Sequence, residues 1–220
     1  MTIQKYIDHT ALKPTTSERD IIDLCNEAKK YQFYAVCVNS GYVALAKELL
    51  SKTSVKICSV VGFPLGAMST DAKIFEAKKA IEDGANEIDM VINIGLLKSK
   101  NYVGVFKDIS DVKMAIGKIP LKVIIEISEL SKNEIIKICE ICLDAKADFI
   151  KTSTGFSKGG ATLTAVKIIR KTVKDQAKIK ASGGIKDFET AQKYIEAGAD
   201  RIGTSAGVAI VTQQTSDANY

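Results

Sequence analysis

The chain has 220 residues, of which 46% are hydrophobic and 26% charged, and 31 basic against 26 acidic residues give a formal net charge of +5. This composition is that of an ordinary globular protein, so it excludes a disordered or low-complexity chain, and no apolar run is long enough to cross a membrane. The lysines are scattered along helix-like segments without interleaved aromatic residues. This pattern argues against nucleic-acid binding and favours small anionic metabolites.

The cysteines indicate a reducing environment. Their number is odd and the N-terminus has no targeting character, so we expect a cytoplasmic protein with free thiols. Cys139 and Cys142 form a C-x-x-C pattern, but it lies inside a helical pattern without a second pair, and the only histidine is His9. We interpret these two cysteines as structural, and we predict neither a metal nor a cofactor.

Strand-like and helix-like segments alternate along the whole chain. Several of the strand-like segments are continuous apolar runs, which is typical of parallel strands covered on both faces. The eight predicted strands are Tyr6 to Thr10, Tyr34 to Asn39, Val55 to Gly62, Glu87 to Asn93, Leu121 to Ile127, Asp148 to Thr152, Ile179 to Ser182 and Arg201 to Thr204.

The segments between them have helical spacing and helix boundaries. Apolar residues recur at helical spacing from Tyr102 to Ile116, and Ser131 with Glu134 forms a capping box that opens the next helix. Gly84 and Gly198 stand where helices should end. Strand and helix repeated eight times predict a single-domain (β/α)8 barrel over residues 1–211, followed by a polar tail at 212–220.

An internal echo aligns three of the strands. Residues 84–89 (GANEID), 146–151 (KADFIK) and 198–203 (GADRIG) share one pattern, so Asp89, Lys151 and Gly203 should occupy the same level and face of their strands. Barrel active sites are built at the C-terminal ends of the strands. Ionisable residues at a common inward level therefore indicate a catalytic centre.

Two lysines predict the chemistry of that centre. Lys151 ends an apolar strand, where burying an ammonium group is costly unless the group is paired or loses its proton. Lys180 should reach the same pocket, and repulsion between two ammonium groups would lower the pKa of at least one. A neutral lysine attacks carbonyls, so we predict a Schiff base on Lys151, with Asp89 and Lys180 moving protons.

Glycine-rich turns after the last two predicted strands indicate an anion site. Gly183 and Gly184 follow the seventh strand, and Gly203 and Ser205 flank the end of the eighth, where barrels commonly bind phosphate. Gly155, after the sixth strand, can contribute to the same site.

The motifs resemble one known family nearly end to end. Residues 148–155 (DFIKTSTG) resemble the Schiff-base segment of the deoxyribose-phosphate aldolase family, and residues 87–93 (EIDMVIN) resemble the segment that carries its catalytic aspartate. Similar segments are found at residues 7–14, 36–39, 60–66, 122–126 and 180–185. The resemblance implies a class I aldolase that interconverts 2-deoxy-D-ribose 5-phosphate with acetaldehyde and D-glyceraldehyde 3-phosphate.

Carried over to this chain, the resemblance implies a role for each matching residue. Lys151 becomes the Schiff-base nucleophile, and Asp89 with Lys180 becomes the proton donor and acceptor pair. Asp8 and Thr10 resemble residues that contact the substrate or support those that do. The phosphate would be bound by Gly155, Gly183, Gly184, Gly203 and Ser205. The partners are then a sugar phosphate and an aldehyde, and the oligomeric state, including a homo-oligomer, stays open.

Some positions depart from the family, and other interpretations remain. Ser40 stands where many relatives have proline, residues 127–130 differ from the expected continuation, and Thr204 occupies a position where relatives often have Ala or Ser. The tail ends in Tyr220, as in some relatives whose tail reaches the active site. Another lysine-dependent sugar-phosphate aldolase, a transaldolase-like enzyme or a non-catalytic phosphate-binding barrel would use the same parts.

Overall fold

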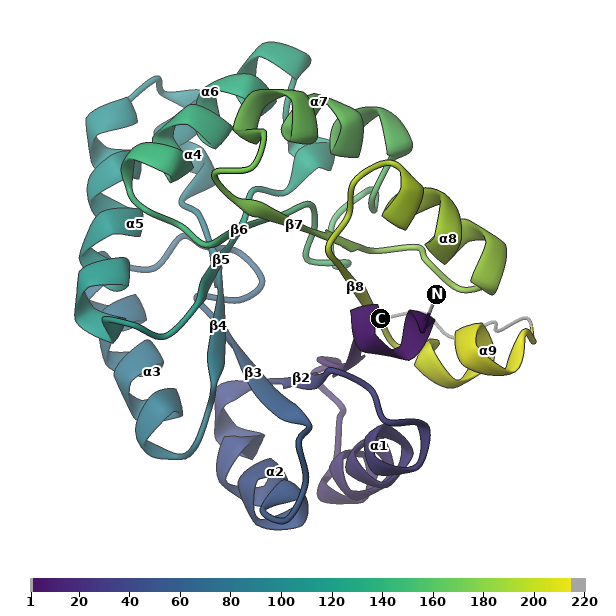
Figure 1. Cartoon of the computed structure of the whole chain (residues 1–220). Coiled ribbons are helices and arrows are strands. Elements are labelled where there is room, and N and C mark those ends of the chain that lie inside the picture. The colour runs from purple at the N-terminus through teal and green to yellow at the C-terminus, as the bar shows by residue number, and fades with distance from the viewer. Residues whose placement is uncertain (1, 215–220) are drawn as a thin grey trace.

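Residues 2–214 are described by a computed structural model, and within them the strands close into a parallel barrel in the order β1 to β8 (Figure 1). The predicted (β/α)8 fold is confirmed, and each of the eight predicted strands is present. The strands are β1 Ile7–Ala11, β2 Ala35–Val38, β3 Lys56–Val61, β4 Glu87–Val91, β5 Leu121–Ile124, β6 Phe149–Lys151, β7 Lys178–Ser182 and β8 Arg201–Thr204.

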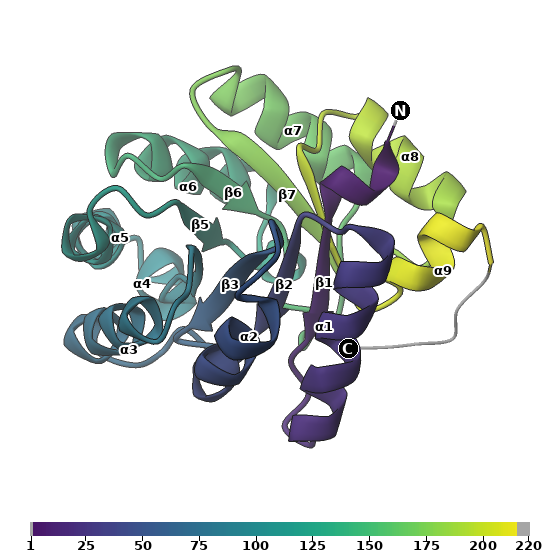
Figure 2. The ribbon, with the colours of Figure 1, turned by 60° about the horizontal axis from the view of Figure 1, so that its bottom comes forward.

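Helices surround the ring of strands, as Figures 1 and 2 show. They are α1 Glu18–Tyr31, α2 Val43–Leu50, α3 Thr70–Glu82, α4 Ile94–Lys98, α5 Tyr102–Ile116, α6 Lys132–Asp144, α7 Leu163–Val173, α8 Phe188–Glu196 and α9 Gly207–Thr212. Short 3-10 turns are found at η1 Ile3–Tyr6, η2 Ser40–Tyr42 and η3 Ile127–Glu129. In the described part of the chain, every helix is too short or too polar to traverse a bilayer.

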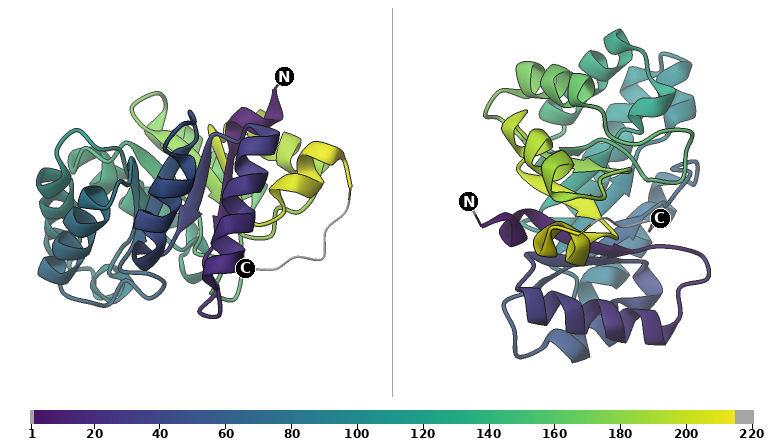
Figure 3. Two further views of the ribbon diagram at one scale, coloured as in Figure 1. Left: turned by 90° about the horizontal axis from the view of Figure 1, so that it is seen from below. Right: turned by 90° about the vertical axis from the view of Figure 1, so that its right-hand side faces the viewer.

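The ends of the chain close the ring. Helix α9 follows β8 and packs against β1 and η1, so the first and last elements lie side by side (Figure 3). The predicted polar tail overlaps the last residue of α9. Residues 215–220, including Tyr220, lie outside the described residues.

Two predicted strands extend too far at their C-terminal ends. β4 stops at Val91 because Asn93 caps α4, its side-chain oxygen accepting a hydrogen bond from the Leu96 N–H at 3.1 Å. β5 stops at Ile124, and Glu126 has a left-handed backbone with φ of 53° just before η3. Local turn chemistry therefore overrides the apolar run at both positions.

The two predicted helices are confirmed, with one difference. In α6, Ser131 and Glu134 form the predicted capping box. In α5, Phe106 is 40% exposed, whereas Asp108 is buried against Lys73 of α3 at 2.6 Å. The apolar spacing located the helix, but this buried ion pair depends on a partner from another helix.

The three echoed segments form the same local structure. Each enters its strand through a residue with positive φ, namely Gly84 at 118°, Lys146 at 59° and Gly198 at 109°. An Asn or Asp side chain two residues later then accepts a hydrogen bond from a backbone N–H of the preceding strand. These acceptors are Asn86 at 3.0 Å, Asp148 at 2.8 Å and Asp200 at 2.8 Å. The sequence echo therefore corresponds to a repeated strand entry, which sets a common register.

The main apolar core lies outside the barrel, between the strands and the helices. Its members include Ile88, Ile150 and Ile202, all fully buried. Each of these isoleucines precedes a residue that faces inward, because successive side chains of a strand point to opposite faces.

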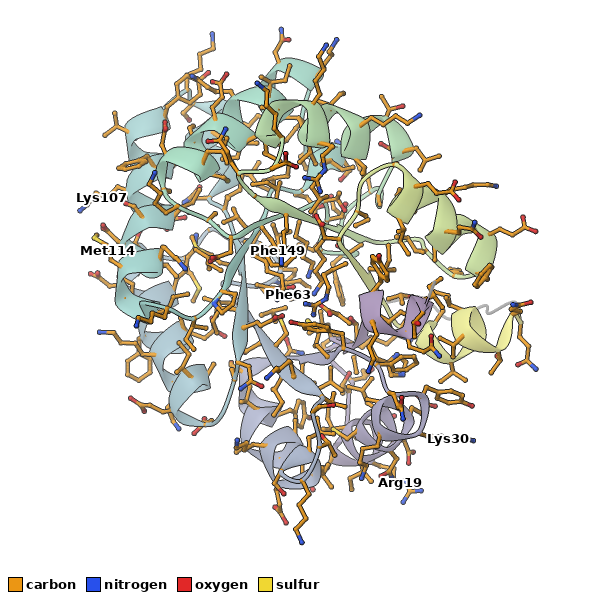
Figure 4. The ribbon with its side chains drawn as sticks, in the orientation of Figure 1. Arg19, Lys30, Phe63, Lys107, Met114 and Phe149 are labelled. Carbon is orange, nitrogen blue, oxygen red and sulfur yellow. The ribbon has the colours of Figure 1, made fainter. Side chains whose placement is uncertain are left out.

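The barrel interior has a different composition. In a closed barrel, alternate strands contribute the side chains of each interior layer, and the register gives four layers. From the N-terminal to the C-terminal ends of the strands they are Ala35, Glu87, Phe149 and Arg201; then Asp8, Cys58, Lys122 and Lys180; then Cys37, Asp89, Lys151 and Gly203; then Thr10, Val60, Ile124 and Ser182. Figure 4 shows Phe149 within the ring, whereas Lys107 and Met114 point away from it. Asp89, Lys151 and Gly203 share one layer, as the echo predicted.

Candidate active site

A single buried carboxylate connects the predicted catalytic residues. Asp89 Oδ2 accepts hydrogen bonds from Lys151 Nζ at 2.9 Å and from Lys180 Nζ at 2.8 Å. Its other oxygen, Oδ1, accepts from Lys122 Nζ at 2.9 Å and from the Cys58 thiol at 3.0 Å. The structure thus brings together the three predicted residues. Lys151 and Lys180 contact Asp89 although they lie 62 and 91 residues after it in the sequence.

Lys151 stands at the C-terminal end of the three-residue strand β6. Its carbonyl accepts a hydrogen bond from the Ile125 N–H at 3.0 Å, and the next residue, Thr152, donates its N–H to the Lys180 carbonyl at 3.1 Å. These bonds fix the backbone on both sides of Lys151. Its side chain is 3% exposed, whereas those of Asp89 and Lys180 are fully enclosed.

A second set of ion pairs lies in the two layers nearer the N-terminal ends of the strands. Lys180 Nζ is 2.5 Å from Asp8 Oδ2, and Lys122 Nζ is 2.6 Å from Glu87 Oε2. Arg201 pairs with both Asp8 and Glu87. Asp8 therefore supports Lys180 from below, while Thr10 lies in the uppermost layer and donates its hydroxyl to the Asp8 carbonyl at 2.8 Å.

These contacts shift the pKa values of Asp89 and Asp8 downward. Burial alone would raise the pKa of Asp89, but the charges of Lys122, Lys151 and Lys180 outweigh it and hold that pKa well below its usual value. Burial would also raise the pKa of Asp8, but the charges of Arg201 and Lys180 outweigh it and lower that pKa to about 2. Both carboxylates are ionised at neutral pH.

The expected repulsion between ammonium groups does not lower the pKa of Lys180. Burial favours its neutral form, but the carboxylates of Asp8 and Asp89 raise its pKa well above the usual value. The repulsion was predicted for the two lysines alone, without the carboxylates of Asp8 and Asp89. Because Asp89 lies between both ammonium groups, attraction outweighs repulsion at Lys180.

The interior has more basic side chains than carboxylates. Within residues 2–214, four basic side chains face three carboxylates in the ion-paired layers, and three of these bases each contact two carboxylates. Lys151 is the fourth base, and in this part of the chain it forms an ion pair with one carboxylate, that of Asp89. Loss of one proton from the cluster would leave three cations facing three anions.

The predicted phosphate turns line a cavity of about 220 Å³ at the C-terminal ends of β6, β7 and β8. Gly155, Gly183, Gly184 and Ser205 line it, in agreement with the placement expected for them. Gly203 is absent from the lining, because its position belongs to the interior layer of Lys151. The cavity is also lined by Ser157, Lys158, Gly159, Gly160, Ile185, Lys186 and Thr204.

Two lysines give this cavity positive charge. Lys158 is 2.9 Å from Glu129, so its charge is partly compensated. Lys186 forms no ion pair within residues 2–214, which leaves its charge available to an anion. Neither lysine could be predicted for this site from the sequence, because only the folded loops bring them beside the glycine turns.

Glu126 holds the loop between Lys151 and this cavity. Its Oε2 accepts hydrogen bonds from the Thr154 hydroxyl and from the Thr154 N–H, the latter at 3.2 Å. Burial raises its pKa, although the bonds from Thr154 oppose this shift. Its Oε1 is buried without a hydrogen-bond partner in the described structure. The left-handed backbone at Glu126 is the conformation that turns this side chain toward the loop.

One cluster in the interior offers ligand atoms of the kind that bind metals. The sulfur atoms of Cys37 and Cys58 and a carboxylate oxygen of Asp89 lie within 4.8 Å of one another. However, the three lysines around Asp89 already neutralise its charge and would repel a cation. These surroundings do not suit a resident metal ion.

Three charged residues of the interior, Glu87, Lys122 and Arg201, were not predicted from the sequence, although a signal was present for two of them. Glu87 and Arg201 each stand two residues before an aligned position of the echo, and residues two apart in a strand share a face. The sequence pattern alone does not show which of Lys122 and Lys178 is the buried lysine. Both lie near strand starts, yet Lys178 is exposed and Lys122 is fully buried.

Comparison with known proteins agrees with this geometry. Residues 2–213 match the family described as DeoC/LacD family aldolase. The deoxyribose-phosphate aldolase 1 of Mesoplasma florum is 54% identical over the full length of both chains. The deoxyribose-phosphate aldolase of Thermococcus gammatolerans is 57% identical over 96% of each chain.

Solved structures share the fold. The structure described as "QR15, an Aldolase" is 46% identical, covers 96% of this chain and 94% of its own, and superposes with a TM-score of 0.92. A deoxyribose-phosphate aldolase from Aeropyrum pernix, described as having a unique tetrameric structure, is 32% identical over 96% of this chain and 89% of its own, with a TM-score of 0.87. A family match over almost the whole chain, with close relatives of equal length, shows that this chain belongs to the DeoC/LacD family of aldolases and is a carbon–carbon lyase.

Proposed function

We propose that this aldolase cleaves 2-deoxy-D-ribose 5-phosphate reversibly into acetaldehyde and D-glyceraldehyde 3-phosphate, through a Schiff base on Lys151. The observation that carries the proposal is the contact of Lys151 Nζ with Asp89 Oδ2, in a cluster with one more cation than it has carboxylates. Two features beyond the catalytic lysine support this substrate. They are a cationic cavity suited to a phosphate and relatives named for this activity.

A nucleophilic lysine must be neutral, and the charge balance favours Lys151 for this role. Removing a proton from Lys122, Lys180 or Arg201 would take one charged partner away from each of two carboxylates. Removing it from Lys151 affects one carboxylate, Asp89, which keeps Lys122 and Lys180. The slight exposure of the Lys151 side chain also leaves it open toward the mouth of the barrel.

The bond changes follow from the chemistry of an amine and an aldehyde. The Lys151 nitrogen adds to C1 of the open-chain sugar, and loss of water gives an iminium ion. Removal of the proton from the C3 hydroxyl breaks the C2–C3 bond, and its electron pair is taken up as an enamine on Lys151. Glyceraldehyde 3-phosphate leaves, C2 is protonated, and hydrolysis of the second iminium releases acetaldehyde and the free amine.

Asp89 and Lys180 supply the proton transfers. Asp89 Oδ2 contacts both Lys151 Nζ and Lys180 Nζ, so one oxygen atom can pass a proton between the nucleophile and the second lysine. The raised pKa of Lys180 keeps it protonated, so it can stabilise negative charge that develops on a substrate oxygen. Asp8 holds Lys180 in this position from the opposite side.

The phosphate would lie in the cavity formed by the turns after β6, β7 and β8. Positive φ values at Gly155, Gly183 and Gly184 give these turns a backbone shape that other residues adopt at a cost. Gly183, which lines the cavity, directly follows Ser182 of the uppermost interior layer, so the cavity lies beside the C-terminal end of the catalytic layers. One end of the substrate can thus be bound while its carbonyl reaches Lys151.

A steady-state assay of the purified protein tests this function. We expect release of acetaldehyde from 2-deoxy-D-ribose 5-phosphate, and loss of that release in Lys151→Ala. Lys178→Ala is the matched control, because Lys178 is an exposed lysine two residues before Lys180 on the same strand, and it should retain activity. Turnover of a different sugar phosphate with no cleavage of this one would overturn the substrate assignment.

A further inference from the structure

Two thiols lie next to each other on the inner face of the barrel. Cys37 of β2 and Cys58 of β3 are register partners in a parallel pair, and both are fully buried. Together with Leu12 and Val60 they form a small cluster separate from the main core, against which Phe63 packs. Figure 4 labels Phe63 inside the ring of strands.

We propose that Cys37 and Cys58 are a modification site, at which a peroxide links them in a disulfide across β2 and β3 and reversibly inactivates the enzyme. Neighbouring strands are about 4.8 Å apart, which lies inside the range of Cα separations that a disulfide spans, about 4.4 to 6.8 Å. The pair is already free and in register. The backbone therefore needs little rearrangement to form the bond.

The two thiols differ in reactivity in the way that such a reaction needs. The contact with Cys58 and the charge of Lys180 lower the pKa of Cys37 to about 7, against the effects of burial and of the Asp89 carboxylate. Burial and the hydrogen bond with Cys37 raise the pKa of Cys58 well above its usual value. Cys37 is thus the attacking thiolate and Cys58 the resolving thiol.

The reaction balances with hydrogen peroxide as the oxidant. The Cys37 thiolate attacks one peroxide oxygen, and the O–O bond breaks. The hydroxide that leaves takes up the proton that the Cys37 thiol released on ionising, and becomes water. The Cys58 sulfur then attacks the Cys37 sulfenic acid, the S–O bond breaks, and the leaving hydroxide takes the Cys58 proton. Two thiols lose two protons and two electrons, and one peroxide becomes two waters.

Access to this site follows from its layer. Cys37 occupies the same interior layer as Asp89 and Lys151. On the proposed function, an aldehyde must reach Lys151 Nζ through the mouth of the barrel. Hydrogen peroxide is smaller than that aldehyde, so the same opening admits it to the Cys37 side of the layer.

The disulfide would change the surroundings of the catalytic carboxylate. The Cys58 thiol donates a hydrogen bond to Asp89 Oδ1, and its sulfur is 3.3 Å from Lys122 Nζ. A disulfide has no S–H to donate, and it moves the Cys58 sulfur toward β2. Asp89 loses one donor, so we expect kcat to fall by at least tenfold in the oxidised protein.

The other cysteines provide an internal comparison. Cys139 and Cys142 lie three residues apart on α6, outside the barrel, and burial raises the pKa of both thiols, that of Cys139 to about 12. Burial also raises the pKa of Cys25 on α1 to about 11. None of these three thiols has a lowered pKa, so none should react with peroxide as fast as Cys37, which makes the first attack.

The experiment is peroxide treatment of the purified protein, followed by peptide mapping without reduction. We expect a mass loss of two hydrogens and one linked pair of peptides, those of Cys37 and Cys58, with activity falling in step and returning after dithiothreitol. Cys37→Ser, measured against its own untreated rate, should resist inactivation, whereas Cys139→Ser should behave like the unmodified chain.

Two results would overturn the proposal. One is oxidation of the Cys139–Cys142 pair before that of Cys37 and Cys58, and the other is inactivation without the linked peptides. Mapping of the unmodified chain remains decisive if a serine variant fails to fold. The linked peptides are read independently of aldolase activity, so a failure here is distinct from a failure of the proposed function.

Discussion

The inner and outer faces of the barrel strands differ in chemistry at adjacent residues. Ile88 and Ile150 belong to the apolar core between strands and helices, while the residues that follow them, Asp89 and Lys151, form the ionic interior. Burying charges costs free energy that their attraction only partly offsets, whereas burying apolar side chains stabilises the fold. The outer face thus accounts for stability, and on the proposed function the inner face is retained for chemistry.

A second ion pair makes the comparison sharper. Lys73 and Asp108 are as buried as the interior groups and lie 2.6 Å apart, but they connect α3 with α5 in the outer shell. Asp108 also accepts a hydrogen bond from the Thr70 hydroxyl at 2.8 Å. One cation faces one carboxylate there, whereas the interior has a cation in excess. Equal burial therefore accompanies two different roles.

The largest expected effect comes from removing the carboxylate at the centre of the interior. Asp89→Asn should lower kcat/KM by about 10²- to 10⁴-fold, because Lys151 and Lys180 lose the oxygen that connects them. Asp108→Asn, the matched change in the shell, should cost about 3–5 kcal/mol of unfolding free energy while leaving kcat/KM within a few-fold. Enzyme assays and urea unfolding of both variants test this contrast, and equal kinetic losses would contradict it.

Truncating an apolar side chain of the outer face should lower stability more than activity. Ile150→Ala removes a fully buried side chain next to Lys151 and should lower the unfolding free energy by about 2–5 kcal/mol. The rate per folded molecule should change far less than in Asp89→Asn. Denaturant unfolding paired with active-site titration measures both quantities. An Ile150→Ala protein of full stability would break the division between the two faces.

Changes in the proposed phosphate site should weaken substrate binding rather than slow the chemical step. Lys186→Ala should raise KM for the phosphorylated sugar by about 10- to 100-fold, the range expected for losing a charge-assisted contact, with little change in kcat. Unphosphorylated deoxyribose should be unaffected. Lys158→Ala should have the smaller effect, because Glu129 already compensates its charge. A fall in kcat with KM unchanged would place Lys186 outside the phosphate site.

The smallest expected effect concerns stability in acid. The pKa of Asp8 is lowered to about 2 in the folded chain, so its ion pairs stabilise the fold fully above about pH 4. That contribution, on the order of 2 kcal/mol, is lost as the pH falls through about 2. Asp8→Asn lacks this component, so its unfolding free energy should fall less steeply over that interval. Urea unfolding across the pH series tests this, and identical slopes would refute it.

The sequence contained enough to predict the barrel and the residues that meet in its interior, but not the charge balance. Alternation of strands and helices and the register of the echo placed Asp89 and Lys151 correctly. The pKa of Lys180 was beyond reach, because it depends on Asp8 from the opposite end of the chain. Likewise Lys122 and Lys178 look alike in their strands, and only pairing across the barrel separates a buried lysine from an exposed one.

On the proposed function, Lys151 is the interior amine that attacks the carbonyl, and borohydride trapping can identify it. The protein is incubated with acetaldehyde and sodium borohydride, digested, and mapped by mass spectrometry. We expect one ethyl group on Lys151, none at this position in Lys151→Ala, and none on Lys122 or Lys180. An ethyl group on another interior lysine, or cleavage activity without any adduct on Lys151, would contradict it.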